Sequence, residues 1–136
     1  MKELILFYSF SGKTKKYVEE LTKSTGADLC EITEVKNRGK LSAYTHGIIQ
    51  VMRGSKSKIN PVNVDFSQYD KIIIAFPVWA SHQPPAINSA VDLLPEGKDI
   101  ELIFVSMSGK SNSEKLVDMI KAKKCNVVSV KDVQMK

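Results

Sequence analysis

A short polar segment near the N-terminus has the residue types that bind an anion. It follows an apolar run at residues 4–7 and contains Ser9, Ser11, Gly12, Lys13 and Thr14. Beyond it, apolar residues recur at helical spacing, so the segment should lie at a helix N-terminus, where unpaired backbone N–H groups favour an anion. The pattern predicts a cradle for one phosphate. The alternative is that Ser11 or Thr14 only caps the helix.

Length and composition indicate one globular domain, spanning residues 1–136. Of the residues, 43% are hydrophobic and 26% are charged, the usual balance of a soluble protein with a single core. We expect a cytoplasmic protein, because the sequence shows neither an apolar run long enough to span a membrane nor a signal-peptide pattern. Two distant cysteines, Cys30 and Cys125, and two histidines argue against a disulfide scaffold and a metal site.

The net charge of +5 comes from one part of the chain. Residues 36–58 contain six lysines and arginines and no acidic residue, and the remaining 14 cations face 15 acids. A solvated face is the first interpretation of this basic segment, and docking of an acidic redox partner or a nucleotide phosphate is the second. Nucleic-acid binding ranks third, since Tyr44 is the only aromatic among these cations.

Strand and helix patterns alternate along the whole chain. We expect strands at residues 4–7, 27–32, 72–76, 100–107 and 126–130, the second of them at a sheet edge. We expect helices at residues 14–25, 42–52 and 85–94, and a last one carrying Leu116, Val117 and Ile120, with Ser111 and Glu114 at capping-box spacing. Such alternation predicts an α/β fold with a parallel sheet and right-handed crossovers.

Three loops follow strongly apolar strands, at residues 9–14, 77–83 and 106–112. Ligands bind at such carboxyl ends in open α/β sheets, and these loops contain hydroxyls, one Trp and one His but no Asp or Glu. That inventory excludes a receiver domain, which needs carboxylates at these ends, and a cysteine phosphatase, which needs Cys where Ser9 stands. A nucleophile elbow is also absent. A P-loop would need glycine at Phe7.

Two motifs resemble the flavodoxin family. Residues 9–14 match the phosphate-loop pattern [ST]-x-[ST]-G-x-[ST], and residues 69–80 resemble the "YD-x-(apolar)-x-x-PVW" segment of short flavodoxin-like proteins, a likeness that continues through residues 84–87. The resemblance covers nearly the whole chain. It implies an open parallel five-stranded sheet of order 2-1-3-4-5 with helices on both faces.

The resemblance also implies an FMN site built from the three loops. The implied cofactor contacts are Ser9, Phe10, Ser11, Gly12, Lys13, Thr14, Pro77, Val78, Trp79, Ala80, Ser81, His82, Ser106, Met107, Ser108 and Gly109. The isoalloxazine ring would stack on Trp79; the alternative for Trp79 is an aromatic without a ligand. His82 is equally well read as a solvated loop residue, and Ser108 and Asn112 as helix caps.

The implied function is electron transfer through bound FMN, with a redox partner protein or a small-molecule acceptor. An FMN-dependent NAD(P)H:quinone-type oxidoreductase is an alternative, but no second dinucleotide fingerprint is visible, which favours a carrier. A non-redox module that binds another phosphate ligand is the third reading.

Two features depart from the resemblance. Familiar flavodoxins are strongly acidic, whereas this chain is basic, so we expect its second reduction potential to be higher than theirs. The family also places a further helix after the last strand, which is missing here. We therefore expect a partly uncovered, apolar sheet face and self-association into a homodimer.

Overall fold

Five parallel strands form a single sheet in the order β2-β1-β3-β4-β5. The structure, a computed structural model, describes residues 2–35, 56–79, 81–106 and 111–134. The strands are β1 (Lys2–Phe7), β2 (Asp28–Glu31), β3 (Tyr69–Pro77), β4 (Asp99–Ser106) and β5 (Asn126–Gln134). The helices are α1 (Lys13–Thr25), α4 (Pro85–Val91), α5 (Glu114–Ala122) and the 3₁₀ turn η2 (Phe66–Gln68). The predicted fold class and strand order are confirmed.

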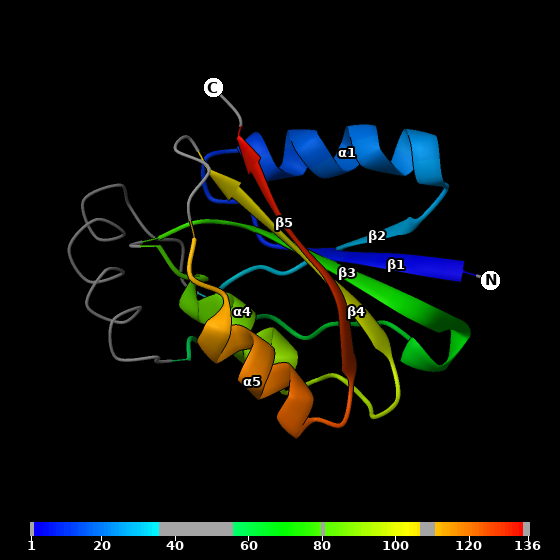
Figure 1. Cartoon of the computed structure of the whole chain (residues 1–136). Coiled ribbons are helices and arrows are strands. Elements are labelled where there is room, and N and C mark those ends of the chain that lie inside the picture. The colour runs from blue at the N-terminus through cyan, green and yellow to red at the C-terminus, as the bar shows by residue number, and fades with distance from the viewer. Residues whose placement is uncertain (1, 36–55, 80, 107–110, 135–136) are drawn as a thin grey trace.

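Helices cover both faces of the sheet. Figure 1 shows α1 on one face, and α4 and α5 on the other. Successive residues of a strand point to opposite faces, so Leu4 and Leu6 of β1 pack in the core under α4 and α5, whereas Ile5 and Phe7 pack against α1. This explains why the central strands are continuous apolar runs. Within the described residues, no helix is long and apolar enough to cross a membrane.

Element ends differ from the predicted ones where weak local signals compete. β5 extends to Gln134 rather than stopping at residue 130, because its pairing with β4 continues and Val133 still reaches the core. α4 ends at Val91 rather than residue 94, since the next amides bond three residues back, as in a 3₁₀ turn. The predicted helix at 42–52 and the strand end at Met107 lie outside the described residues.

The predicted capping box before α5 is wrong. The Ser111 hydroxyl donates to Asp132 on β5 instead of capping the helix. The backbone N–H of Glu114 donates to Oδ1 of Asn112 at 3.1 Å, so Asn112 satisfies one of the unpaired donors at this helix end. The capping role considered for Asn112 is therefore the one that the structure supports.

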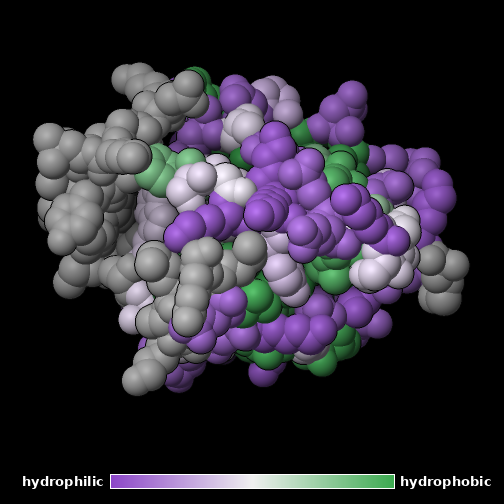
Figure 2. Space-filling model, turned by 90° about the horizontal axis from the view of Figure 1, so that it is seen from above, coloured by the Kyte–Doolittle hydropathy of each residue, from purple (hydrophilic) through white to green (hydrophobic). Residues whose placement is uncertain are grey.

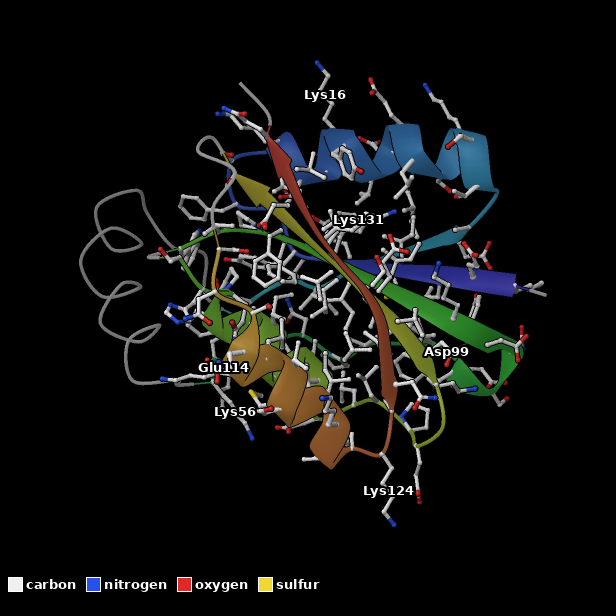
Figure 3. The ribbon with its side chains drawn as sticks, viewed as in Figure 1. Lys16, Lys56, Asp99, Glu114, Lys124 and Lys131 are labelled. Carbon is white, nitrogen blue, oxygen red and sulfur yellow. The ribbon has the colours of Figure 1, made fainter. Side chains whose placement is uncertain are left out.

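An ion-pair cluster lies on the sheet face that α1 covers only in part. Glu101 of β4 has a side chain only 8% exposed, yet its two oxygens lie 3.0 Å from Lys71 Nζ and 3.2 Å from Lys131 Nζ. The lysines come from β3 and β5, on either side of β4, and Figure 3 labels Lys131 near the centre of the sheet. Each lysine keeps its charged end partly in water while its stem covers the sheet.

This cluster corrects the expectation of an apolar sheet face. Seen from the α1 side in Figure 2, the surface is mainly hydrophilic, and hydrophobic atoms form small, separate patches. A large apolar patch was the reason to expect self-association. The part of the chain that the structure describes shows no such patch on this face, so this reason for a homodimer is removed. The oligomeric state itself stays a prediction.

Candidate functional site

A cleft of about 160 Å³ opens at the carboxyl edge of the sheet, beside the N-terminus of α1. In the sheet, β2 lies on one side of β1 and β3 lies on the other. The strand order therefore reverses between β1 and β3, which is where α/β sheets bind ligands. The described residues that line the cleft are Phe10, Ser11, Lys13, Thr14, Pro77, Val78, Trp79, Val105 and Ser106.

The first loop is shaped by Ser9 and Gly12. The Ser9 hydroxyl oxygen accepts from the backbone N–H groups of Gly12 and Lys15, both at 3.2 Å. Gly12 has a φ of 94°, in the left-handed region that glycine adopts without steric cost. A Cβ there would meet nothing within 4 Å, so the backbone angle, and not space, requires glycine. The loop is thus preorganised around the start of α1.

The electrostatic character of this helix start is positive. The first turn of α1 has no acidic residue and carries Lys13, Lys15 and Lys16, although acids are the residues that stabilise a helix N-terminus. Lys15 lies 4.0 Å from Glu31, Lys16 points away from the sheet (Figure 3), and Lys13 lines the cleft. Helix dipole and lysines together favour an anion here.

Trp79 forms part of the opposite wall and contacts two aromatic rings, that of Tyr8 directly after β1 and that of Phe10 in the first loop. Its ring centroid lies 5.9 Å from that of Tyr8 at an interplanar angle of 78°, and 5.6 Å from that of Phe10 at 87°. Both are edge-to-face arrangements, which aromatic pairs prefer over face-to-face stacking. The first and second loops are therefore joined through Trp79.

The second loop closes on itself in a tight turn. Trp79 N–H donates to the His82 carbonyl at 2.8 Å, and His82 N–H donates to the Trp79 carbonyl at 2.9 Å. Ser81 has a φ of 68°, a left-handed angle that is uncommon for a residue with a side chain. Its carbonyl accepts from the backbone N–H of Asn112 at 2.6 Å, which joins the second loop to the third.

The predicted site residues fall into three groups. Those that line the cleft are Phe10, Ser11, Lys13, Thr14, Pro77, Val78, Trp79 and Ser106. Ser9, Gly12, Ser81 and His82 shape the loops around it without lining it. Ala80, Met107, Ser108 and Gly109 lie outside the described residues.

Several residues at this edge were missed by sequence reasoning. Val105, the penultimate residue of β4, lines the cleft, and the apolar strand pattern gave it no distinction. Tyr8 is buried beside Trp79 and donates its hydroxyl hydrogen to Glu34, and Asp132 accepts from Ser111. The position of Tyr8 directly after a strand was a usable signal. Glu34 and Asp132 also bring carboxylates close to loops that contain none themselves.

The residues of the cleft suit a ligand with a phosphate at one end and a flat ring at the other. Hydroxyls, backbone amides and Lys13 gather at the helix start, where they can donate to phosphate oxygens. The other wall is apolar, with Pro77, Val78 and Val105 beside the indole of Trp79. An aromatic ring system would bury apolar surface there.

Comparisons with known proteins agree with this geometry. A flavoprotein from Lactobacillus acidophilus NCFM, solved in complex with FMN, superposes with a TM-score of 0.80 at 24% identity, covering 95% of this chain and 91% of its own. A protein from Bacteroides eggerthii DSM 20697 assigned as a flavoprotein gives a TM-score of 0.82 at 18% identity, covering 96% and 86%. The flavodoxin of Streptococcus pneumoniae TIGR4 gives 0.53 at 17% identity, covering 100% and 88%.

These similarities establish the fold. No curated protein sequence matches the chain significantly. The family model described as Flavodoxin matches residues 2–135, which is nearly the whole chain. The resemblance to the flavodoxin family is thereby confirmed, and the chain belongs to that family.

Proposed function

We propose that this protein binds FMN at the carboxyl edge of the sheet and carries electrons through it. The observation that carries the proposal is the cleft itself, in which an anion-favouring helix start faces an apolar wall containing Trp79. Membership of the flavodoxin family and the FMN complex of the Lactobacillus flavoprotein support FMN as the ligand. FMN would supply the redox chemistry, since it accepts and releases electrons.

The chain's own residues would bind, orient and shield the cofactor. The phosphate would be bound at residues 9–14, by backbone amides and hydroxyls with Lys13 beside them. The ring would lie against Trp79, Pro77 and Val78, with the second and third loops, including Ser81, His82 and Ser106, around it. The bond from Asn112 to Ser81 would keep these two loops together at the ring's edge.

An electron carrier is favoured over a reductase because the sequence offers one phosphate motif and no second dinucleotide fingerprint. A carrier needs only one bound flavin and a surface for its partners, whereas an NAD(P)H-dependent reductase must also orient a nicotinamide against the ring. A basic protein would favour acidic electron-transfer partners, because charge complementarity guides such encounters.

The proposal is tested by purification and titration. We expect a yellow protein with flavin absorption, or an apoprotein that binds added FMN, and we expect riboflavin, which lacks the phosphate, to bind more weakly. A colourless protein that binds neither compound would overturn the flavin assignment. Steady-state NAD(P)H oxidation with a quinone acceptor then separates the two redox functions: a carrier alone should show none, and robust turnover would identify a reductase.

A further inference from the structure

Trp79 is the single tryptophan of the sequence, and its indole contacts the rings of Tyr8 and Phe10. Tyr8 is 4% exposed, so its ring presents a fixed surface to the indole at a centroid distance of 5.9 Å. The backbone of Tyr8 is fixed as well, since its N–H donates to the Ala75 carbonyl at 3.0 Å. The orientation of Trp79 therefore depends on where Tyr8 lies.

Tyr8 is in turn held by a carboxylate from a distant part of the chain. Its hydroxyl donates to Oε1 of Glu34 at 2.5 Å. A buried tyrosine normally finds a partner for its hydroxyl, and here that partner is a carboxyl group. The bond fixes the tilt of the Tyr8 ring and not only its depth.

The position of Glu34 is well defined because backbone hydrogen bonds hold the residues on both sides of it. Val35 N–H donates to the Lys58 carbonyl at 3.0 Å, and Asn60 N–H donates to the Thr33 carbonyl at 2.8 Å. Glu34 itself forms an isolated antiparallel bridge with Ile59. These bonds join residues 33–35 to residues 58–60, so the carboxylate of Glu34 comes from a paired stretch of backbone.

We infer that Tyr8 and Glu34 are positioning residues that hold Trp79 in the orientation in which it forms the cleft wall. The part of this inference that concerns the flavin rests on the proposed function; the part that concerns Trp79 does not. Neither residue lines the cleft, so they act on a bound ring through Trp79. Stacking aromatics must be held at a defined angle to contribute to binding, and the Tyr8–Glu34 pair supplies that constraint.

The test uses Trp79 as its own reporter. Its near-ultraviolet circular dichroism and fluorescence anisotropy are measured without flavin in Tyr8→Phe, Tyr8→Leu, Glu34→Ala and Glu34→Gln. The matched control is Tyr69→Phe, because the Tyr69 hydroxyl also donates to a carboxylate, that of Asp28 at 2.7 Å, but at the other end of the sheet. Glu34→Gln retains an oxygen that can accept from Tyr8 and serves as the conservative rescue.

We expect Tyr8→Leu to abolish most of the tryptophan circular dichroism and to lower the anisotropy, with Tyr8→Phe and Glu34→Ala intermediate. Glu34→Gln and Tyr69→Phe should resemble the native protein. In the flavin titration, Tyr8→Leu should weaken FMN and riboflavin by the same factor, about threefold to tenfold, since the ring site changes and the phosphate loop does not.

Two results would overturn the inference. One is a Trp79 signal in Tyr8→Phe, Tyr8→Leu and Glu34→Ala that equals that of Tyr69→Phe. The other, a Trp79 signal that changes while both flavin affinities stay native, would overturn the part of the inference that concerns the flavin. Absence of flavin binding in the native protein would instead refute the proposed function and the flavin part of this inference, while the Trp79 measurements would still decide the positioning role.

Discussion

Ser9 has a structural role that does not depend on a ligand. Its hydroxyl oxygen accepts from the N–H groups of Gly12 and Lys15, the second of which lies in the first turn of α1. An N-cap side chain does the same work from the residue just before a helix. Gly12 occupies that place here and has no side chain to cap with, so Ser9 supplies the cap from three residues further back.

Replacing Ser9 by alanine should therefore lower stability in the absence of flavin. We expect Ser9→Ala to reduce the free energy of unfolding by about 1 kcal/mol, the usual effect of losing a cap, in urea denaturation monitored by circular dichroism in phosphate-free buffer. Ser9→Thr, which keeps a hydroxyl, should lose less. The control is Ser11→Ala, since Ser11 is exposed and such changes stay within about 0.5 kcal/mol. Equal losses from Ser9→Ala and Ser11→Ala would contradict the capping role.

Ser81 stores backbone strain at the turn of the second loop. Its φ of 68° costs a residue with a Cβ about 1–2 kcal/mol, and strain of this kind concentrates at functional sites. We expect Ser81→Gly to raise the free energy of unfolding by up to about 1 kcal/mol, because glycine removes the strain but loses more chain entropy on folding.

The measurement is again urea denaturation, and an unchanged m-value would show that the unfolded state is comparable. Lys124 has a φ of 60° in a turn remote from the cleft, so Lys124→Gly is the matched control and should give a similar gain. Ser81→Val should lower the free energy of unfolding, because a β-branched side chain tolerates this backbone angle least. A Ser81→Gly protein less stable than the native one would refute the strain.

At the scale of elements, the strands could be predicted because their signals are local, whereas the order of the sheet followed from the resemblance to the flavodoxin family. The apolar run at 72–76 is short, rich in isoleucine and followed by proline, which favours a buried strand. Pro84 and Pro85 mark the start of α4, where Pro85 occupies the first turn. The loops at the strand ends follow from parallel topology alone. Most of the residues lining the cleft were therefore predictable.

What could not be predicted are contacts between residues far apart in the chain. Tyr8 and Glu34 are 26 residues apart, and no local pattern links a tyrosine to that carboxylate. Glu101 likewise interrupts an apolar strand without a local reason. Its lysine partners come from β3 and β5, and only the sheet register brings Lys71 and Lys131 beside it. Tertiary pairing of this kind also displaced Ser111 from its expected cap to Asp132.

The Glu101 cluster makes stability depend on pH in a defined direction. Burial raises the pKa of Glu101, but the hydrogen bonds and charges of Lys71 and Lys131 outweigh it and leave that pKa below its ordinary value. The hydrogen bond to Glu101 raises the pKa of Lys71, and burial opposes this only in part. A carboxyl group with a lowered pKa stabilises the fold above its ordinary value of about 4.3 and loses that contribution as the pH falls through the folded pKa.

Glu101→Gln should therefore be destabilised most near pH 7, and its stability should approach that of the native protein as the pH falls through the lowered pKa of the native carboxyl. We expect a loss of about 1–2 kcal/mol at pH 7, toward the low end of the roughly 1.5–3 kcal/mol that is usual for a hydrogen bond to a charged group, because both lysines are exposed enough to be rehydrated. Urea denaturation at pH 3, 5 and 7 measures this, because urea, unlike guanidinium chloride, does not screen the ion pairs. Glu96→Gln, which removes an exposed partner of Lys124, is the control. A difference between Glu101→Gln and native protein that stays constant with pH would show that the ion pairs contribute nothing.

At the scale of the whole molecule, the charge of +5 sets the field in which a bound cofactor would be reduced. Three lysines stand in the first turn of α1, and one of them, Lys13, lines the cleft. The described carboxylates of Glu34 and Asp132 lie at the same sheet edge, each accepting a hydrogen bond from a hydroxyl. These carboxylates lower the positive electrostatic potential near the cleft, but the chain as a whole keeps its excess of positive charge. Within the proposed function, adding an electron to the flavin is then opposed less than in strongly acidic flavodoxins.

The second reduction potential of bound FMN should accordingly be higher than in acidic flavodoxins, and it should fall as salt is added, because screening removes an attraction for the extra negative charge. Replacing Lys15 and Lys16 together by glutamate changes the charge at the start of α1 by four units. It should lower the potential by on the order of 10–30 mV at low ionic strength, because these charges act on the ring through water. Lys121 and Lys124 offer the matched double charge reversal, since Lys124 lies at the far end of the molecule (Figure 3). Spectroelectrochemical titration at about 0.01 M and 1 M salt, where the screening length shrinks from roughly 30 to 3 Å, compares all three proteins. The charge argument fails if the potential rises with salt. It also fails if both double variants shift the potential equally, because the field would then act through net charge alone and not through the lysines at the start of α1.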